Sequence, residues 1–192
     1  MRGRVGTGTA LAALAASALA LGLAPLALAD SYSWVEHTTS ESGGQGVQGA
    51  WLARSGFVLF GLAVLWLVHL RTLRWRQPAT VFHIVFAVCM VGVAAFSLRS
   101  WVTGAAYDAI EDLLHSECAT VMGFAFAFGV TAVAFQRRSR GQRWRALDAV
   151  AVVASVVLPI WMSIDGSVDG AVQRAMFVIA YLWYAREALT TP

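Results

Sequence analysis

A polar segment in an otherwise apolar chain contains the first residues that could do chemistry. Residues 30–46 lack the spacing of a helix and are rich in hydrogen-bonding side chains. His37, Ser40 and Glu41 lie close together in this segment, and the glycines that follow them allow tight turns. A carboxylate can act as a general base that activates a bound water, and the Ser40 hydroxyl is a hydrogen-bonding group beside it. Glu41 and Ser40 are therefore candidate catalytic residues.

A second polar segment, residues 107–118, leads directly into an apolar stretch. If it forms a helix, Asp108, Asp112 and His115 fall on one face, within about 60° of one another. Carboxylate and imidazole groups are standard ligands of divalent metals. The same acids are also favoured near the amino end of a helix by its macrodipole, without any ligand. The pattern therefore predicts a structural network, a metal or catalytic site, or a ligand or proton site.

We expect the two polar segments to form one cluster on one side of the protein. Arg54 and Arg174 lie near the ends of neighbouring apolar stretches and could form an ion-pair network with the acids of this cluster. The predicted binding cluster consists of His37, Ser40, Glu41, Arg54, Asp108, Asp112, His115 and Arg174.

Composition identifies the environment of these residues. Of the 192 residues, 58% are hydrophobic and 13% are charged, and the mean hydropathy is +0.64. A soluble domain is about a quarter charged, so this chain has too few ionised groups to cover a water-facing surface. The composition excludes a cytosolic enzyme, a nucleic-acid-binding module and a disordered tail. It predicts an integral membrane protein.

A membrane-spanning helix needs about 20 mainly apolar residues. The stretches that meet or approach this length are residues 9–29, 52–70, 79–98, 115–135, 146–164 and 171–189. The predicted fold is an all-α bundle of six transmembrane spans, with residues 1–192 forming a single membrane domain. Residues 1–29 also resemble a secretory signal peptide, and their cleavage would leave five spans. We expect the first span to be retained, because its apolar run is long enough to cross the bilayer.

The placement of arginine predicts the orientation. Eleven of the 14 basic residues lie at the amino terminus, after the second and fourth predicted spans, and near the carboxyl terminus. Cytoplasmic segments of membrane proteins carry an excess of basic residues. We therefore expect a multi-pass protein of the plasma membrane with both termini in the cytoplasm and the polar cluster outside. His69 and His83, at the cytoplasmic ends of spans, are expected to hydrogen-bond to lipid headgroups.

Several short polar motifs resemble those of a known family. Residues 32–43 (YSWVEHTTSESG) and 56–61 (GFVLFG) are similar to the early motifs of an uncharacterised prokaryotic multi-pass membrane family, domain of unknown function 998. Residues 112–115 (DLLH) and 170–174 (GAVQR) resemble its later motifs. The resemblance covers nearly the whole chain and implies six spans with a retained first helix. It implies no activity, because the function of the family is unknown.

Two functional hypotheses follow. In the first, the chain is a non-enzymatic membrane protein without a cofactor that binds a lipid or a membrane-protein partner at the polar cluster, or senses through it. In the second, it is a metal-dependent hydrolase of lipid headgroups at the outer leaflet. His37, Asp112 and His115 would then hold a divalent metal, and Glu41 would activate a bound water. The mixed charge of the cluster favours internal pairing, and with it the first hypothesis.

Overall fold

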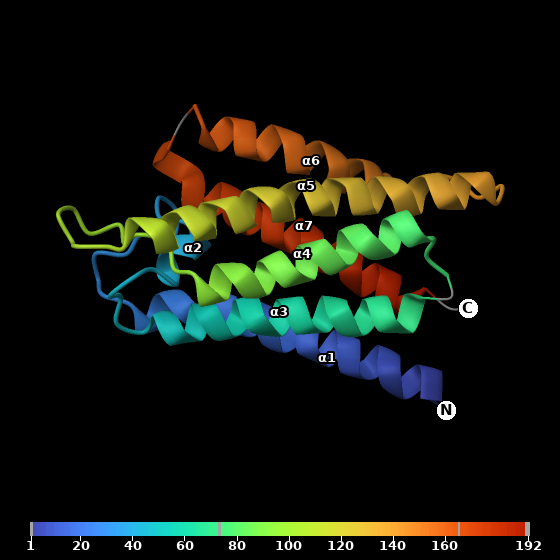
Figure 1. Cartoon of the computed structure of the whole chain (residues 1–192), viewed down its shortest axis with the longest axis horizontal. Helices are drawn as coiled ribbons and strands as arrows, with labels where there is room; N and C mark the ends of the chain where they lie inside the picture. Colours follow the sequence, from blue (N-terminus) through green and yellow to red (C-terminus); the bar gives the residue numbers. More distant parts are fainter. Residues whose placement is uncertain (1, 73, 165, 191–192) are drawn as a thin grey trace.

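The structure is a computed structural model that describes residues 2–72, 74–164 and 166–190. All regular secondary structure in these residues is helical (Figure 1), as predicted. The elements are α1 (Arg2–Leu23), the 3-10 helix η1 (Ala24–Ala27), α2 (Thr39–Ser42), α3 (Ala50–Arg71), α4 (Gln77–Ala95), α5 (Ala109–Ser139), α6 (Ala146–Met162), the 3-10 helix η2 (Gly166–Val168) and α7 (Asp169–Leu189).

Four stretches of the described chain are helical, long and apolar enough to cross a membrane, namely Val5–Ala27, α3, α4 and α5. The 31 residues of α5 extend about 46 Å, which exceeds the roughly 30 Å of a bilayer core. Neither α6 nor α7 qualifies alone. α6 has only 17 residues, and α7 carries charges in its first and last turns. Together, with a bend of 116°, they count as one further candidate. The described residues thus support four spans, or up to five, and six spans are not confirmed.

The long helices lie side by side, and Figure 1 shows both termini at the same end of the bundle. The α3–α4 and α5–α6 connections lie at this end too, which we call the terminal end. The opposite end, called the loop end, holds the irregular segments 28–38, 43–49 and 96–108, with α2 between the first two. The two polar segments found in the sequence therefore lie at the same end.

The first helix is held in the bundle by polar as well as apolar contacts. The Ser17 hydroxyl of α1 donates to the Gly56 carbonyl of α3 at 2.6 Å and lies 2.5 Å from the Tyr181 hydroxyl of α7. Nearer the terminal end, the Trp66 indole of α3 donates to the Gly6 carbonyl at 3.1 Å. α1 therefore packs as an integral helix of the bundle.

Buried ion pairs join the helices at the terminal end. Arg137 of α5 pairs with Asp148 of α6 at 2.6 Å and also with Glu187 of α7. Arg145 pairs with Glu187 at 3.0 Å, and Arg71 of α3 donates to carbonyl groups in the last turn of α7. Asp148 is only 1% exposed, so its charge depends on its partners rather than on water. This cluster therefore ties α3, α5, α6 and α7 together.

An aromatic group extends this cluster into the core and overturns one sequence prediction. The Trp183 indole donates to Asp148 at 2.9 Å. His83 is 0% exposed, and its Nδ1 lies 2.9 Å from the Tyr184 hydroxyl. Its ring packs against those of Trp75 and Trp183, with centroid distances of 4.5 and 5.0 Å. The expectation that His83 reaches lipid headgroups is wrong, because its face of α4 packs against the aromatic side chains of α7.

The buried ion pairs predict a large stability effect at Asp148. Replacing Asp148 with Ala leaves Arg137 partly unpaired in the interior, which costs about 3–5 kcal/mol. We expect the thermal unfolding midpoint in detergent, followed by tryptophan fluorescence, to fall by on the order of 10 °C. The control is Glu117→Ala, which removes an exposed carboxylate of α5 and should change the midpoint by less than about 2 °C. Equal shifts for the two variants would contradict the role assigned to the cluster.

Candidate functional site

The start of α7 binds four consecutive carbonyl groups of the segment that precedes α2. The N–H groups of Gly170 and Ala171 donate to the two central carbonyls of residues 34–37, at 3.2 and 3.0 Å. The Arg174 guanidinium donates to the two flanking carbonyls, at 2.6 and 3.0 Å. The first N–H groups of a helix have no partner within the helix. This contact therefore satisfies both the helix start and the irregular segment.

Gly170 and Tyr32 complete this contact. A Cβ atom at position 170 would collide with the carbonyl oxygens of Trp34 and His37, so only glycine allows the close approach. Tyr32 accepts a hydrogen bond from Arg174 at 2.6 Å and donates to the Thr38 carbonyl at 2.8 Å. Burial raises the pKa of Tyr32 above its usual value, although the Arg174 charge opposes this effect. The hydroxyl therefore stays protonated and available as a donor.

Glu41 and Arg54 bind the backbone of the same segment. The Glu41 carboxylate accepts from the Thr38 N–H at 2.6 Å, and the Glu41 N–H donates to the Thr38 hydroxyl at 3.1 Å. This pair is a capping box at the start of α2. Arg54 donates to the Gly43 and Gly44 carbonyls at 2.9 and 3.0 Å. The expected ion pairs of Arg54 and Arg174 with acids are not found among the described residues. Both guanidinium groups bind carbonyl oxygens of the irregular segment instead.

The acids at the start of α5 also bind backbone groups. Asp108 is the N-cap of α5 and accepts from the N–H groups of the next turn at 2.8 and 3.1 Å. Glu111 accepts from the Ser97 N–H, and Asp112 accepts from the Arg99 N–H, each at 2.7 Å. The prediction that these acids suit a helix amino terminus without a ligand is consistent with this arrangement.

A single glutamine joins the two polar segments. The Gln45 amide donates to the Ser97 and Asp108 carbonyls at 2.8 and 3.0 Å, and its oxygen accepts from the Asp108 N–H at 2.7 Å. The two segments therefore meet, as the sequence predicts, but they meet through an amide and the backbone rather than through charged side chains.

The three candidate metal ligands each have a separate backbone partner. His37 Nδ1 accepts from an N–H four residues earlier at 2.9 Å, and Asp112 binds the segment before α5. His115 is 2% exposed, and its Nδ1 lies 2.8 Å from the Phe96 carbonyl oxygen. Within the described ranges, no three His, Cys, Asp or Glu side chains are placed to share a metal ion. The structure therefore does not assemble His37, Asp112 and His115 into a ligand set.

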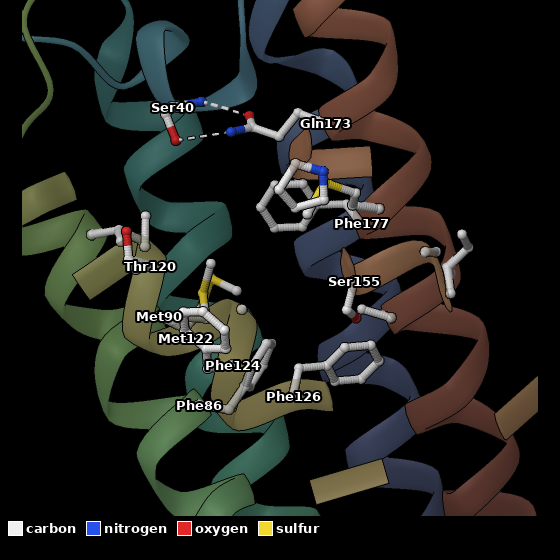
Figure 2. A pocket seen from close by; sticks show the side chains of 18 of the residues that line it. Ser40, Phe86, Met90, Thr120, Met122, Phe124, Phe126, Ser155, Gln173 and Phe177 are labelled. Carbon is white, nitrogen blue, oxygen red and sulfur yellow. Dashed lines mark hydrogen bonds between the residues drawn. The ribbon is translucent and has the colours of Figure 1, made fainter. Parts of the chain in front are cut away.

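A cavity of about 400 Å³ lies inside the bundle next to α2, and the sequence prediction missed it. Side chains from α3, α4, α5, α6 and α7 form most of its wall. Ser40 and Gln173 face each other at the loop end of the cavity, and Phe86 and Phe126 lie toward its opposite end (Figure 2). The Ser40 N–H donates to Gln173 Oε1 at 3.2 Å, and Gln173 Nε2 donates to Ser40 Oγ at 3.4 Å.

The cavity lining is apolar and rich in phenylalanine and methionine. Its aromatic members are Phe57, Phe60, Phe86, Phe124, Phe126 and Phe177. Four of the five methionines of the chain line it, namely Met90, Met122, Met162 and Met176. Methionine is flexible and polarisable and is common at surfaces that accept varied apolar ligands. Across the described residues, the lining holds no charged side chain, and its polar members are Ser40, Thr120, Ser155 and Gln173.

The cavity opens sideways along α5. Phe124 lines the cavity and is also 61% exposed, and Thr120, one turn earlier, is exposed as well. On the facing wall, Pro159 lies inside α6 and has no N–H to donate to the Ser155 carbonyl. One sequence signal could have pointed here, because Gln173 is the only glutamine inside a predicted span.

The contact at the start of α7 predicts that Arg174 holds the loop end in place. Replacing Arg174 with Met removes its hydrogen bonds to carbonyls 34 and 37 and to Tyr32, and bonds to a charged group contribute about 1.5–3 kcal/mol each. We expect at least tenfold faster amide hydrogen exchange in residues 33–43. Arg99→Met, which removes an exposed arginine at the same end, should leave that exchange unchanged. Unchanged exchange in Arg174→Met would refute the anchoring role.

Comparison with known proteins identifies the family to which the chain belongs. A search of curated proteins found no match to this chain, and a search of solved structures found none either. A profile for the family described as protein of unknown function, DUF998, matches residues 9–189, which is nearly the whole chain. The match confirms the resemblance of the chain to this family. The chain belongs to the DUF998 family.

Proposed function

We propose that this protein is a multi-pass membrane protein that binds a lipid-like amphiphile in the cavity beside α2. The observation that supports this proposal is the cavity itself, which combines a methionine- and phenylalanine-rich wall with one hydrogen-bonding pair, Ser40 and Gln173. Ligand sites are typically apolar pockets with a few placed polar groups. The sideways opening along α5 suits entry from the bilayer.

The size of the cavity supports an occupant rather than a packing gap. Its volume of about 400 Å³ lies within the roughly 300–1,000 Å³ of typical ligand pockets. Its opening beside Thr120 and Phe124 gives an apolar chain access from the side. An apolar chain in the cavity would restore the missing dispersion contacts.

The ligand would lie next to the contact that anchors the loop end. Gln173 faces the cavity, and the following residue, Arg174, holds the segment before α2. A change in the position of Gln173 would therefore be passed to the polar cluster through its neighbour Arg174. This arrangement supports a binding or sensing role for the polar cluster. It also supports the idea that a membrane-protein partner contacts the cluster.

We further propose six spans in a plasma membrane, with both termini in the cytoplasm. α7 runs from the loop end, where Gly170 and Arg174 bind residues 34–37, to the terminal end, where Glu187 joins the ion pairs. α6 runs back from Asp148 at the terminal end toward Met162 on the cavity wall. Two charged residues of α7, Arg174 and Glu187, thus have partners toward its two ends. The arginine-rich connections share the terminal end with both termini (Figure 1).

Filling the cavity should displace the amphiphile. Ala154 of α6 lines the cavity, and Ala149 of the same helix is exposed. We expect native mass spectrometry of protein purified in mild detergent to show bound lipid on the wild type and at least fivefold lower occupancy in Ala154→Phe. Ala149→Phe adds the same side chain outside the cavity and should keep wild-type occupancy.

Two results would overturn the proposed function. One is a wild-type protein that carries no lipid and takes up none when lipid is added back. The other is equal occupancy in Ala154→Phe and Ala149→Phe. Elemental analysis of the same samples tests the hydrolase hypothesis, because stoichiometric zinc or manganese would favour it instead.

A further inference from the structure

We infer that the cavity selects an uncharged amphiphile that places an apolar chain inside it and whose hydroxyl or carbonyl head binds between Ser40 and Gln173. This inference rests on the proposed function and names the ligand class of the same site. Three features carry it: the chemistry of the polar pair, the commitment of the nearby charges, and the volume of the cavity.

The polar pair can exchange its own bonds for bonds to a neutral head. The two Ser40–Gln173 hydrogen bonds are long, at 3.2 and 3.4 Å, compared with the usual 2.9–3.0 Å for N–H···O bonds. Gln173 offers an amide donor and an acceptor, and the Ser40 hydroxyl offers both as well. A hydroxyl or carbonyl oxygen placed between them could accept from Gln173 Nε2 and, as a hydroxyl, donate to Ser40 Oγ. Both partners are visible at the loop end of the cavity in Figure 2.

Three charged side chains of the loop end, those of Arg174, Arg54 and Glu41, bind other groups. Arg174 follows Gln173 in sequence, but its guanidinium binds three carbonyls and the Tyr32 hydroxyl. Arg54 binds the Gly43 and Gly44 carbonyls, and Glu41 caps α2. A carboxylate, phosphate or ammonium head would therefore enter an apolar cavity without a counter-charge, which is strongly unfavourable. A neutral head avoids this cost.

The volume fits one chain. A cavity of about 400 Å³ lies within the roughly 300–1,000 Å³ of typical ligand pockets and has room for the inner part of an apolar chain. One acyl or prenyl chain can place this part inside, with its end leaving between Thr120 and Phe124 along α5. The flexible methionine side chains allow either a saturated or an unsaturated chain to pack.

The test uses three probes with the same eighteen-carbon chain and different heads. They are cis-9-octadecen-1-ol, cis-9-octadecenoate and cis-9-octadecenylamine, each added to delipidated full-length protein at the same mole fraction in a nonionic detergent. Native mass spectrometry measures occupancy at pH 7.5, where the acid and the amine carry charge. We expect at least fivefold higher occupancy for the alcohol than for either charged probe.

A charge placed at Gln173 should redirect this preference. In Gln173→Glu the carboxylate faces the head position, so we expect the ratio of amine to alcohol occupancy to rise at least fivefold. Gln48→Glu makes the same change at an exposed position of the loop end and should keep the wild-type ratio. Circular dichroism and the thermal midpoint confirm that both variants fold.

The outcomes separate this inference from the proposed function. If none of the probes binds and no lipid copurifies, the proposed function itself fails. If all three bind equally, or the charged probes bind better to the wild type, the cavity binds lipid but the neutral-head inference is overturned. A Gln173→Glu protein that folds and keeps the wild-type order of probes also overturns it, because the head then lies elsewhere.

Discussion

The contact between the first turn of α7 and the carbonyl groups of residues 34–37 is the interaction on which the loop end depends. These carbonyls belong to a segment that has no regular ladder of its own, so their donors come from a neighbouring element. α7 supplies two N–H groups that every helix start leaves unused, together with one guanidinium. Because the contact sets where α7 begins, it also sets Gln173 opposite Ser40. The cavity therefore has a defined polar end only as long as this contact holds.

α7 also connects the two polar ends of the bundle. Arg174 binds carbonyls at the loop end, and Glu187 accepts from Arg137 and Arg145 at the terminal end. Between them the helix is mainly apolar and contributes to the cavity wall. α7 carries too many charged residues to qualify as a span by composition. Arg174 and Glu187 nevertheless lie toward the two ends of the helix, where a membrane helix tolerates charge best.

Hydropathy locates most helices because each must bury an apolar face over a length that the bilayer dictates. The stretches 52–70 and 79–98 correspond to Ala50–Arg71 and Gln77–Ala95. The stretch 115–135 becomes Ala109–Ser139, because Asp108 caps a helix that continues past the apolar run. Contacts between helices follow no such rule. Arg137 lies 11 residues from Asp148 and 50 from Glu187, and no local pattern pairs them.

The candidate site shows the same division. The polar residue types and the meeting of the two segments could be predicted, because so polar a stretch in an apolar chain needs partners. The identity of those partners could not be predicted, since helical periodicity gives the face on which Asp112 and His115 lie but not what lies opposite. The cavity could not be predicted from the sequence either, because it depends on side-chain volume that is missing between α5, α6 and α7. Only the assembled bundle reveals that space.

The methionines of the cavity make its polarity sensitive to oxidants. Oxidation converts a thioether into a sulfoxide, which is polar and chiral. Met90, Met122, Met162 and Met176 come from four different helices around one space, so a single oxidised side chain would place a strong hydrogen-bond acceptor in a mainly apolar wall. An apolar chain would lose affinity and water would gain it, while the polar contacts that hold the two ends of the bundle would be unaffected. Oxidative damage would thus be felt first in what the protein holds, before it is felt in how the protein is folded.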